Sequence, residues 1–204
     1  MSSTNRGYNR HETDYYVTPK DAVKVFFANW LEDLMSEFHD DTLCIGSRPD
    51  RARWLDPCAG GDEKHGMSYP DVIKKEFNPE ILETVDVRED SLAEIKVDYR
   101  LWEPNAQLPP QVIITNPPFY LAEEIINKAL KDVAENGYVV MLLRLNFFGS
   151  NQRFPFWQKQ LPIWAYVHHR RFSFTDNGKT DSIEYMHAVW QKDNSPSFTM
   201  LKVI

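Results

Sequence analysis

Residues 112–120 read VIITNPPFY, an apolar and largely β-branched run that stops at two consecutive prolines. The length and composition of residues 111–115 predict a buried strand, and the prolines prevent it from continuing as strand or helix. Asn116 is therefore expected at the carboxyl end of a strand. In open α/β sheets that edge is where ligands bind.

The turn at residues 116–119 has the groups needed to hold a planar amine. Two prolines fix the backbone and remove donors, which leaves carbonyl acceptors in a rigid turn. We expect a catalytic clamp made of Asn116, Pro117, Pro118 and Phe119. The Asn116 side-chain oxygen and the Pro117 carbonyl can each accept one amine N–H, while Phe119 stacks on the ring that carries the amine. The plainer alternative is a strand that merely ends in a proline turn.

These four residues resemble the motif of the amino-methyltransferases, which methylate adenine N6, cytosine N4 or a glutamine side chain. The resemblance implies S-adenosylmethionine as the cofactor. It also implies that Asn116 lies against the cofactor as well as against the target amine.

A second informative stretch is RWLDPCAGGD, residues 53–62, in which a short strand is followed by an acid and a glycine turn. Glycines at such a turn supply positive φ and let the backbone approach a ligand closely. The stretch resembles the cofactor loop of class I methyltransferases, which implies cofactor-binding roles for Asp56, Cys58 and Gly60. The chain departs from the pattern at Asp62, where the family usually has its last glycine.

The segment before the first helix is a further candidate for cofactor contact. Thr18 as N-cap and Pro19 at the first helical position predict the start of a helix over residues 20–38. Together with Tyr16, these residues resemble the methyltransferase segment that closes over the methionine end of the cofactor. Helix capping and cofactor contact are compatible roles for Thr18.

Two acids complete the expected cofactor site. Asp86 lies near the carboxyl end of a strand predicted over residues 83–88, where a carboxylate can accept from both ribose hydroxyls. The alternative for Asp86 is an ordinary solvated loop acid. Asp98 is followed by an aromatic residue, and this pair resembles the family's adenine-contacting position.

The later part of the chain continues the alternation of strands and helices. We expect a helix over residues 121–135 and strands over residues 138–145, 163–167 and 185–191. This alternation predicts an α/β fold with a mostly parallel sheet, an antiparallel end strand and helices on both faces. A Rossmann-like class I methyltransferase fold is what the resemblance implies. Residues 170–190 resemble the late segment of phage-type DNA N6-adenine methyltransferases.

The composition is that of one soluble α/β unit. A chain of 204 residues suits a single domain, which we place at residues 14–204 after a flexible polar arm at residues 1–13. Two cysteines without a Cys-x-x-Cys motif, and the lack of an early apolar signal segment, favour a cytoplasmic protein of a bacterium or a phage-infected host. No apolar run approaches membrane-spanning length. The histidines lack ligand spacing, so we expect no metal.

The formal net charge of −7 argues against a nucleic-acid partner, but the charge is unevenly distributed. Residues 144–179 hold six Lys or Arg and one acid, a local charge of +5, which leaves −12 for the rest of the chain. Aromatic residues are interleaved with these cations, as expected where bases stack and phosphates are bound, although several are expected to belong to the core. The nucleic-acid candidates are Arg144, Arg153, Arg170, Arg171, Phe172 and Lys179.

Taken together, the sequence predicts transfer of a methyl group from S-adenosylmethionine to adenine N6 in DNA. Three alternatives stay open: the same reaction on RNA, methylation of a protein glutamine, and a cofactor-binding or DNA-binding module without activity. The chain has no room for a separate target-recognition domain. A partner subunit or self-association is therefore a candidate source of target recognition.

Overall fold

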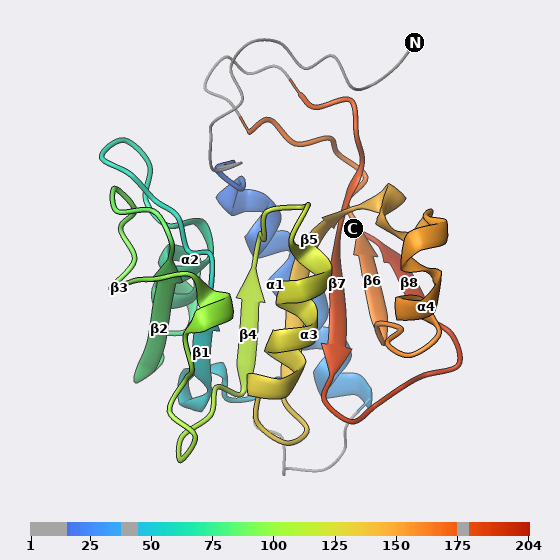
Figure 1. Ribbon diagram of the computed structural model, residues 1–204, viewed down its shortest axis with the longest axis horizontal. Coiled ribbons are helices and arrows are strands. Elements are labelled where there is room, and N and C mark those ends of the chain that lie inside the picture. The colour runs from blue at the N-terminus through green and yellow to red at the C-terminus, as the bar shows by residue number, and fades with distance from the viewer. Residues whose placement is uncertain (1–15, 38–44, 175–179) are drawn as a thin grey trace.

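The computed structural model describes residues 16–37, 45–174 and 180–204, and within them eight strands form one sheet (Figure 1). The strand order is β3-β2-β1-β4-β5-β7-β6-β8. β7 alone among these strands runs antiparallel to its neighbours, β5 and β6. In chain order the strands are β1 Arg53–Asp56, β2 Ile81–Asp86, β3 Ile95–Lys96, β4 Val112–Thr115, β5 Tyr138–Arg144, β6 Trp164–Val167, β7 Tyr185–Gln191 and β8 Met200–Val203.

Helices cover both faces of the sheet, with α3 in front of it and α1 behind it in Figure 1. The α-helices are α1 Lys20–Glu37, α2 Ser68–Glu76, α3 Ala122–Asp132 and α4 Phe154–Trp157. Short 3-10 helices are η1 Pro49–Arg51, η2 Tyr99–Leu101, η3 Leu145–Phe148 and η4 Asn151–Arg153. Buried side chains of α1 and α2 share one apolar cluster, and those of α3 and α4 share a second one. The mostly parallel, Rossmann-like fold expected from the sequence is thus confirmed.

The central strands are buried on both faces, which explains their continuous apolar sequences. All four residues of β4 are buried, as are the first six of β5. A strand covered on both sides needs no polar residues at alternate positions. The prolines that follow β4 then end it at Thr115, so that Asn116 lies at the carboxyl edge as expected.

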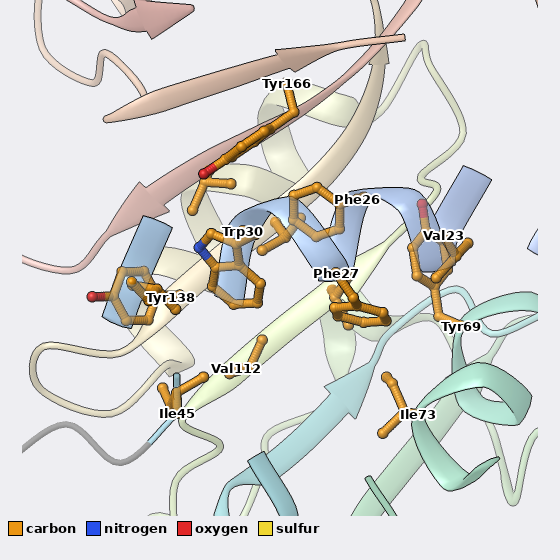
Figure 2. Close-up of a cluster of buried hydrophobic side chains, with 14 of the residues drawn as sticks. Val23, Phe26, Phe27, Trp30, Ile45, Tyr69, Ile73, Val112, Tyr138 and Tyr166 are labelled. Carbon is orange, nitrogen blue, oxygen red and sulfur yellow. The ribbon is translucent and has the colours of Figure 1, made fainter. Parts of the chain in front are cut away.

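An aromatic stripe fixes α1 against the sheet (Figure 2). Phe26 and Trp30 are fully buried, and their rings stack with centroids 5.4 Å apart. Trp30 also meets the ring of Tyr138 from β5 edge to face at 5.6 Å. Residues one helical turn apart lie on the same face of a helix, so this stripe sets both the position and the rotation of α1.

The position of the antiparallel strand differs in detail from the expectation. The predicted strand at the end of the sheet is β7, which lies inside the sheet between β5 and β6. The edge is formed by β8, which the sequence analysis did not identify because three of its four residues are exposed and it lacks apolar alternation. The predicted arm at residues 1–13 lies outside the described residues. None of the helices in the described ranges combines the length and apolar composition needed to cross a membrane.

Removing the Trp30 side chain should destabilise the protein strongly, because the residue is fully buried between α1 and β5. Trp30→Ala is expected to lower the free energy of unfolding by about 3–5 kcal/mol. Glu32→Ala, at an exposed position of the same helix, should change it by less than about 0.5 kcal/mol. Urea denaturation of both variants checks this, and equal losses would contradict the packing described for α1.

Candidate active site at the carboxyl edge of the sheet

A cavity of about 220 Å³ lies where β1, β2 and β4 end. The loops after these strands line it together with the segment that precedes α1. The structure brings most of the expected cofactor residues together here, namely Tyr16, Thr18, Cys58, Gly60, Asp86, Asp98 and Asn116. Pro19 and Asp56 do not line the cavity: Pro19 leads into α1, and Asp56 is buried behind the loop.

The turn after β1 depends on its two glycines. Gly60 and Gly61 have φ of 63° and 78°, the left-handed region that side chains disfavour. The backbone N–H of Gly60 donates to the Asp86 carboxylate at 2.8 Å, which ties this turn to the end of β2. A Cβ at Gly61 would lie only 3.0 Å from the Leu92 side chain. The backbone therefore reaches the cavity without side chains in between.

Asp86 lines the cavity with a carboxylate that backbone donors hold in place. Its second oxygen accepts the Arg88 backbone N–H at 2.9 Å, so each carboxylate oxygen has one backbone donor. A carboxylate oxygen has two lone pairs, and one on each oxygen remains for a ligand. Asp86 is thus a fixed acceptor at the strand end, at the place expected for a ribose partner.

Asp98 is held by charge rather than by burial. The Arg100 guanidinium lies 2.6 Å from its carboxylate, and the Arg100 backbone N–H donates to it at 2.9 Å. These contacts lower the pKa of Asp98 below its usual value. The same carboxylate caps η2, whose residue Tyr99 also lines the cavity.

The departure at Asp62 does not disturb the glycine turn. Asp62 accepts the backbone N–H groups of Lys64 and His65, both at 2.8 Å, and its own N–H donates to the His65 carbonyl at 2.8 Å. Asp62 therefore closes a local turn of its own. Its φ is not in the left-handed region, so the position has no need of a glycine.

Asp56 lies beneath the loop and carries a perturbed acidity. Burial, and to a smaller degree the nearby charge of Asp86, raises the pKa of Asp56 to about 7, although the bond from the Cys58 backbone N–H opposes the rise. A carboxyl group with this pKa is partly protonated near neutral pH. It can therefore change charge when a cation binds close by.

The Asn116 side chain has a defined orientation in the clamp. Its Nδ2 donates to the Thr18 hydroxyl at 3.0 Å and lies 3.5 Å from the Tyr16 carbonyl. The amide oxygen therefore remains as the acceptor. The Thr18 hydroxyl bonds Asn116, so Thr18 does not cap α1 with its side chain as expected. The Pro19 carbonyl instead accepts the N–H groups of Ala22 at 3.0 Å and of Val23 at 3.3 Å.

The two prolines of the clamp lie at the cavity or beside it, whereas Phe119 packs near another aromatic side chain. Pro118 lines the cavity and Pro117 is buried beside it. Phe119 instead packs near Tyr185, and the guanidinium of Arg144 covers one of its ring faces at 4.4 Å. Tyr120 lines the cavity with a side chain that is 74% exposed.

The expected nucleic-acid residues have different environments. Phe172 is buried and stacks on Tyr185 at 5.4 Å, so it belongs to the core. Arg171 forms an ion pair with Glu184 at 2.8 Å, and the Arg153 guanidinium lies 4.2 Å from the ring of Phe147. Arg170 is exposed and forms no ion pair with a described carboxylate. Lys179 lies outside the described residues.

Some residues at the cavity escaped sequence analysis. They are Ser68, Tyr69, Arg88, Tyr120, Leu121 and Ile125. Tyr120 directly follows the clamp, so its position in the sequence was a usable indication. Tyr69 has no such indication, because only the packing of α2 on α1 brings it to the cavity. In residues 16–37, 45–174 and 180–204, no three or more His, Cys, Asp or Glu side chains form a group able to hold a metal ion.

Asp56→Asn should stabilise the protein at alkaline but not at acidic pH. The folded-state pKa of about 7 is above the unfolded value of about 3.9, so the native state binds more protons between these values and its stability falls as pH rises through that window. Asparagine cannot ionise. Urea denaturation at pH 5 and pH 8 should therefore show a relative gain on the order of 2–4 kcal/mol at the higher pH.

Asp98→Asn serves as the control for that experiment. Its pKa is lowered, so the carboxylate is ionised at both pH values and the effect of the substitution should be the same at each. An unchanged effect of Asp56→Asn between pH 5 and pH 8 would contradict the buried, partly protonated state.

Known proteins resemble this chain in fold rather than in sequence. No family model and no curated protein matches the sequence. A Listeria monocytogenes protein assigned as a class I S-adenosylmethionine-dependent methyltransferase has a TM-score of 0.61 and 14% identity, over 98% of this chain and 68% of its own. A Pyrococcus horikoshii protein assigned as an RNA methyltransferase has a TM-score of 0.61 and 12% identity, over 93% of this chain and 94% of its own.

The type IIG restriction endonuclease BpuSI also matches, with a TM-score of 0.61 and 10% identity. The match covers 89% of this chain but only 26% of the endonuclease, which is a much longer protein. Together with the strand order, these likenesses show that the chain has the fold of the class I S-adenosylmethionine-dependent methyltransferases.

Proposed function

We propose that this protein transfers a methyl group from S-adenosylmethionine to the N6 amino group of adenine in DNA. The observation that carries the proposal is the orientation of Asn116. Its amide nitrogen is engaged by Thr18 at 3.0 Å, which leaves its oxygen as an acceptor beside the cavity. The Asn116 side-chain oxygen and the Pro117 carbonyl can together accept the two N–H groups of an exocyclic amine.

The residues at the cavity fit the proposed cofactor. The glycine turn presents backbone without side chains, and Asp86 retains acceptor capacity at the end of β2. In our proposal Gly60 and Tyr16 contact the amino-acid moiety, Asp86 the ribose and Asp98 the adenine. When bound, S-adenosylmethionine supplies an activated methyl group. The acids nearby suit a positively charged sulfonium.

The clamp then acts on the target amine by position and charge. The Asn116 oxygen and the Pro117 carbonyl each accept an N–H, which turns the nitrogen lone pair away from both. When the nitrogen bonds to the methyl group and the methyl–sulfur bond breaks, the nitrogen gains positive charge. The same two acceptors stabilise that charge until one N–H proton leaves to solvent. An adenine stacked inside a duplex cannot bring its amino group to these two acceptors, so the base has to leave the stack. Phe119 is the proposed stacking partner, although Arg144 already covers one face of its ring.

RNA is the second candidate substrate. It is favoured by the likeness to the protein assigned as an RNA methyltransferase, whereas the likeness to the restriction endonuclease favours DNA. The clamp residues would be the same for both. Incubation with labelled S-adenosylmethionine and unmethylated DNA or RNA, followed by digestion to nucleosides, separates them. Label in N6-methyldeoxyadenosine supports the proposal, and label in a ribonucleoside or in protein redirects it.

Asn116→Ala should abolish most turnover while cofactor affinity changes little. Loss of an acceptor for a transition-state charge costs roughly 2–4 kcal/mol, a decrease in kcat of about 30- to 1,000-fold. Initial rates and calorimetric binding of S-adenosylmethionine are the measurements. A variant that keeps half of the wild-type rate would remove Asn116 from the proposed mechanism.

Arg170→Ala should weaken DNA binding in a salt-dependent way, because Arg170 is exposed and forms no ion pair with a described carboxylate. Loss of one phosphate contact lowers the slope of log affinity against log salt by about 0.9. Arg171→Ala should have a smaller effect, since Arg171 is already paired with Glu184. Lys131→Ala, at an exposed position of α3, is the control. Identical slopes for all four proteins would place the DNA elsewhere.

A further inference from the structure

A chain of hydrogen bonds leads from the clamp into the interior of the protein. It starts at Asn116, whose Nδ2 donates to the Thr18 hydroxyl at 3.0 Å. The Thr18 side chain interacts in turn with the hydroxyl of Tyr69, which lines the same cavity and lies on α2 beside α1 (Figure 2). The Tyr69 hydroxyl lies 2.8 Å from Nε2 of His187, and Nδ1 of His187 lies 2.7 Å from Nε2 of His168. The chain thus joins five residues that are far apart in sequence.

The inner members of this chain are buried and held in fixed positions. Thr18, Tyr69 and His187 are at most 2% exposed, and His168 is 5% exposed. The His187 imidazole stacks on Phe26 at 4.2 Å, and the His168 ring meets Phe172 at 4.7 Å. Burial lowers the pKa of His168 to about 4 and that of His187 well below its usual value. Both imidazoles are therefore neutral near pH 7, each with one donor and one acceptor nitrogen.

A chain of groups that each donate once and accept once has only two arrangements of its protons. In the first, Asn116 donates to Thr18, Thr18 to Tyr69, Tyr69 to Nε2 of His187, and Nδ1 of His187 to His168. In the second, every donor becomes an acceptor, and Thr18 donates to the Asn116 side chain. The first arrangement leaves the Asn116 oxygen at the cavity, whereas the second turns the amide so that its NH₂ group lies there.

The Tyr16 carbonyl distinguishes the two arrangements. This carbonyl lies 3.5 Å from Nδ2 of Asn116 and can only accept, so it suits the amide nitrogen and repels the amide oxygen. The first arrangement is therefore the stable one. His187 and His168 then both carry their proton on Nδ1.

We propose that Thr18, Tyr69, His187 and His168 are positioning residues that hold the Asn116 amide with its oxygen toward the substrate. The inference rests on the proposed function and deepens it, because it explains how the site selects its target group. An exposed acceptor binds the N–H of an exocyclic amine. The reversed chain would present donors and would suit a base carbonyl instead, so the chain makes the site specific for amino groups.

The first test reads the proton positions directly and does not require activity. Long-range ¹H–¹⁵N correlation spectra of protein labelled with ¹⁵N-histidine distinguish the two neutral tautomers of each imidazole. Signals of His187 and His168 with the proton on Nδ1 are expected. A proton on Nε2 of His187 would overturn the proposal. The tautomer measurement tests the positioning role even if the wild-type protein methylates no nucleic acid. That second outcome would refute only the proposed function.

The second test measures whether Tyr69 acts through Thr18. Thr18→Val should lower kcat about 10- to 100-fold with little change in the Kd for S-adenosylmethionine, and Thr18→Ser should restore most of the rate. Tyr69→Phe should lower kcat about tenfold in the wild-type background but hardly at all in the Thr18→Val background. Additive effects in the double variant, or an unchanged kcat in Tyr69→Phe, would overturn the proposal.

Tyr166→Phe is the matched control for Tyr69→Phe. Tyr166 is another fully buried tyrosine packed on Phe26, and its hydroxyl donates to Asp33 at 2.9 Å, outside the chain. This variant should lose stability but keep its kcat. A fall in kcat as large as that of Tyr69→Phe would show that the effect is general loosening of the core and would refute the positioning role.

Discussion

The hydrogen bond between Asn116 and Thr18 is the constraint on which the site depends. It spans 98 positions of sequence and joins the end of β4 to the segment before α1. Each partner is fixed independently, Asn116 by the buried β4 and Thr18 by the helix that follows it. The aromatic stripe of α1 therefore does more than fill the core, because the burial of Phe26 and Trp30 sets the position of the hydroxyl that orients the clamp.

The three acids of the site are controlled in three different ways. Burial keeps Asp56 partly protonated, two backbone N–H groups hold Asp86, and an arginine pairs with Asp98. Three unpaired carboxylates at one sheet edge would repel one another and destabilise the loops. The arrangement avoids this cost while each acid keeps a fixed position. A cationic ligand then meets a negative but ordered environment.

Sequence analysis identified the parts of the site that local chemistry determines. Prolines ended β4 at Asn116, and glycines marked the turn after β1, because both residue types restrict or extend the backbone by themselves. It missed Tyr69 and the His168–His187 pair, which have no local pattern and come together only through tertiary packing. It also missed β8, whose exposed residues lack the apolar alternation that predicts strands.

The same limit applies to the charge of residues 144–179, because a sequence count does not show which cations are already paired. A count along the sequence treats each cation as available, but the fold brings Glu184 to Arg171 and places the Arg144 guanidinium over Phe119. Burial of Phe172 removes an aromatic ring from the surface in the same way. Near the clamp, the Arg144 guanidinium lies over the ring proposed to stack with the target base, and Arg88 and Arg100 line the cavity. A base that stacks on Phe119 must therefore use the other face of the ring or displace the guanidinium.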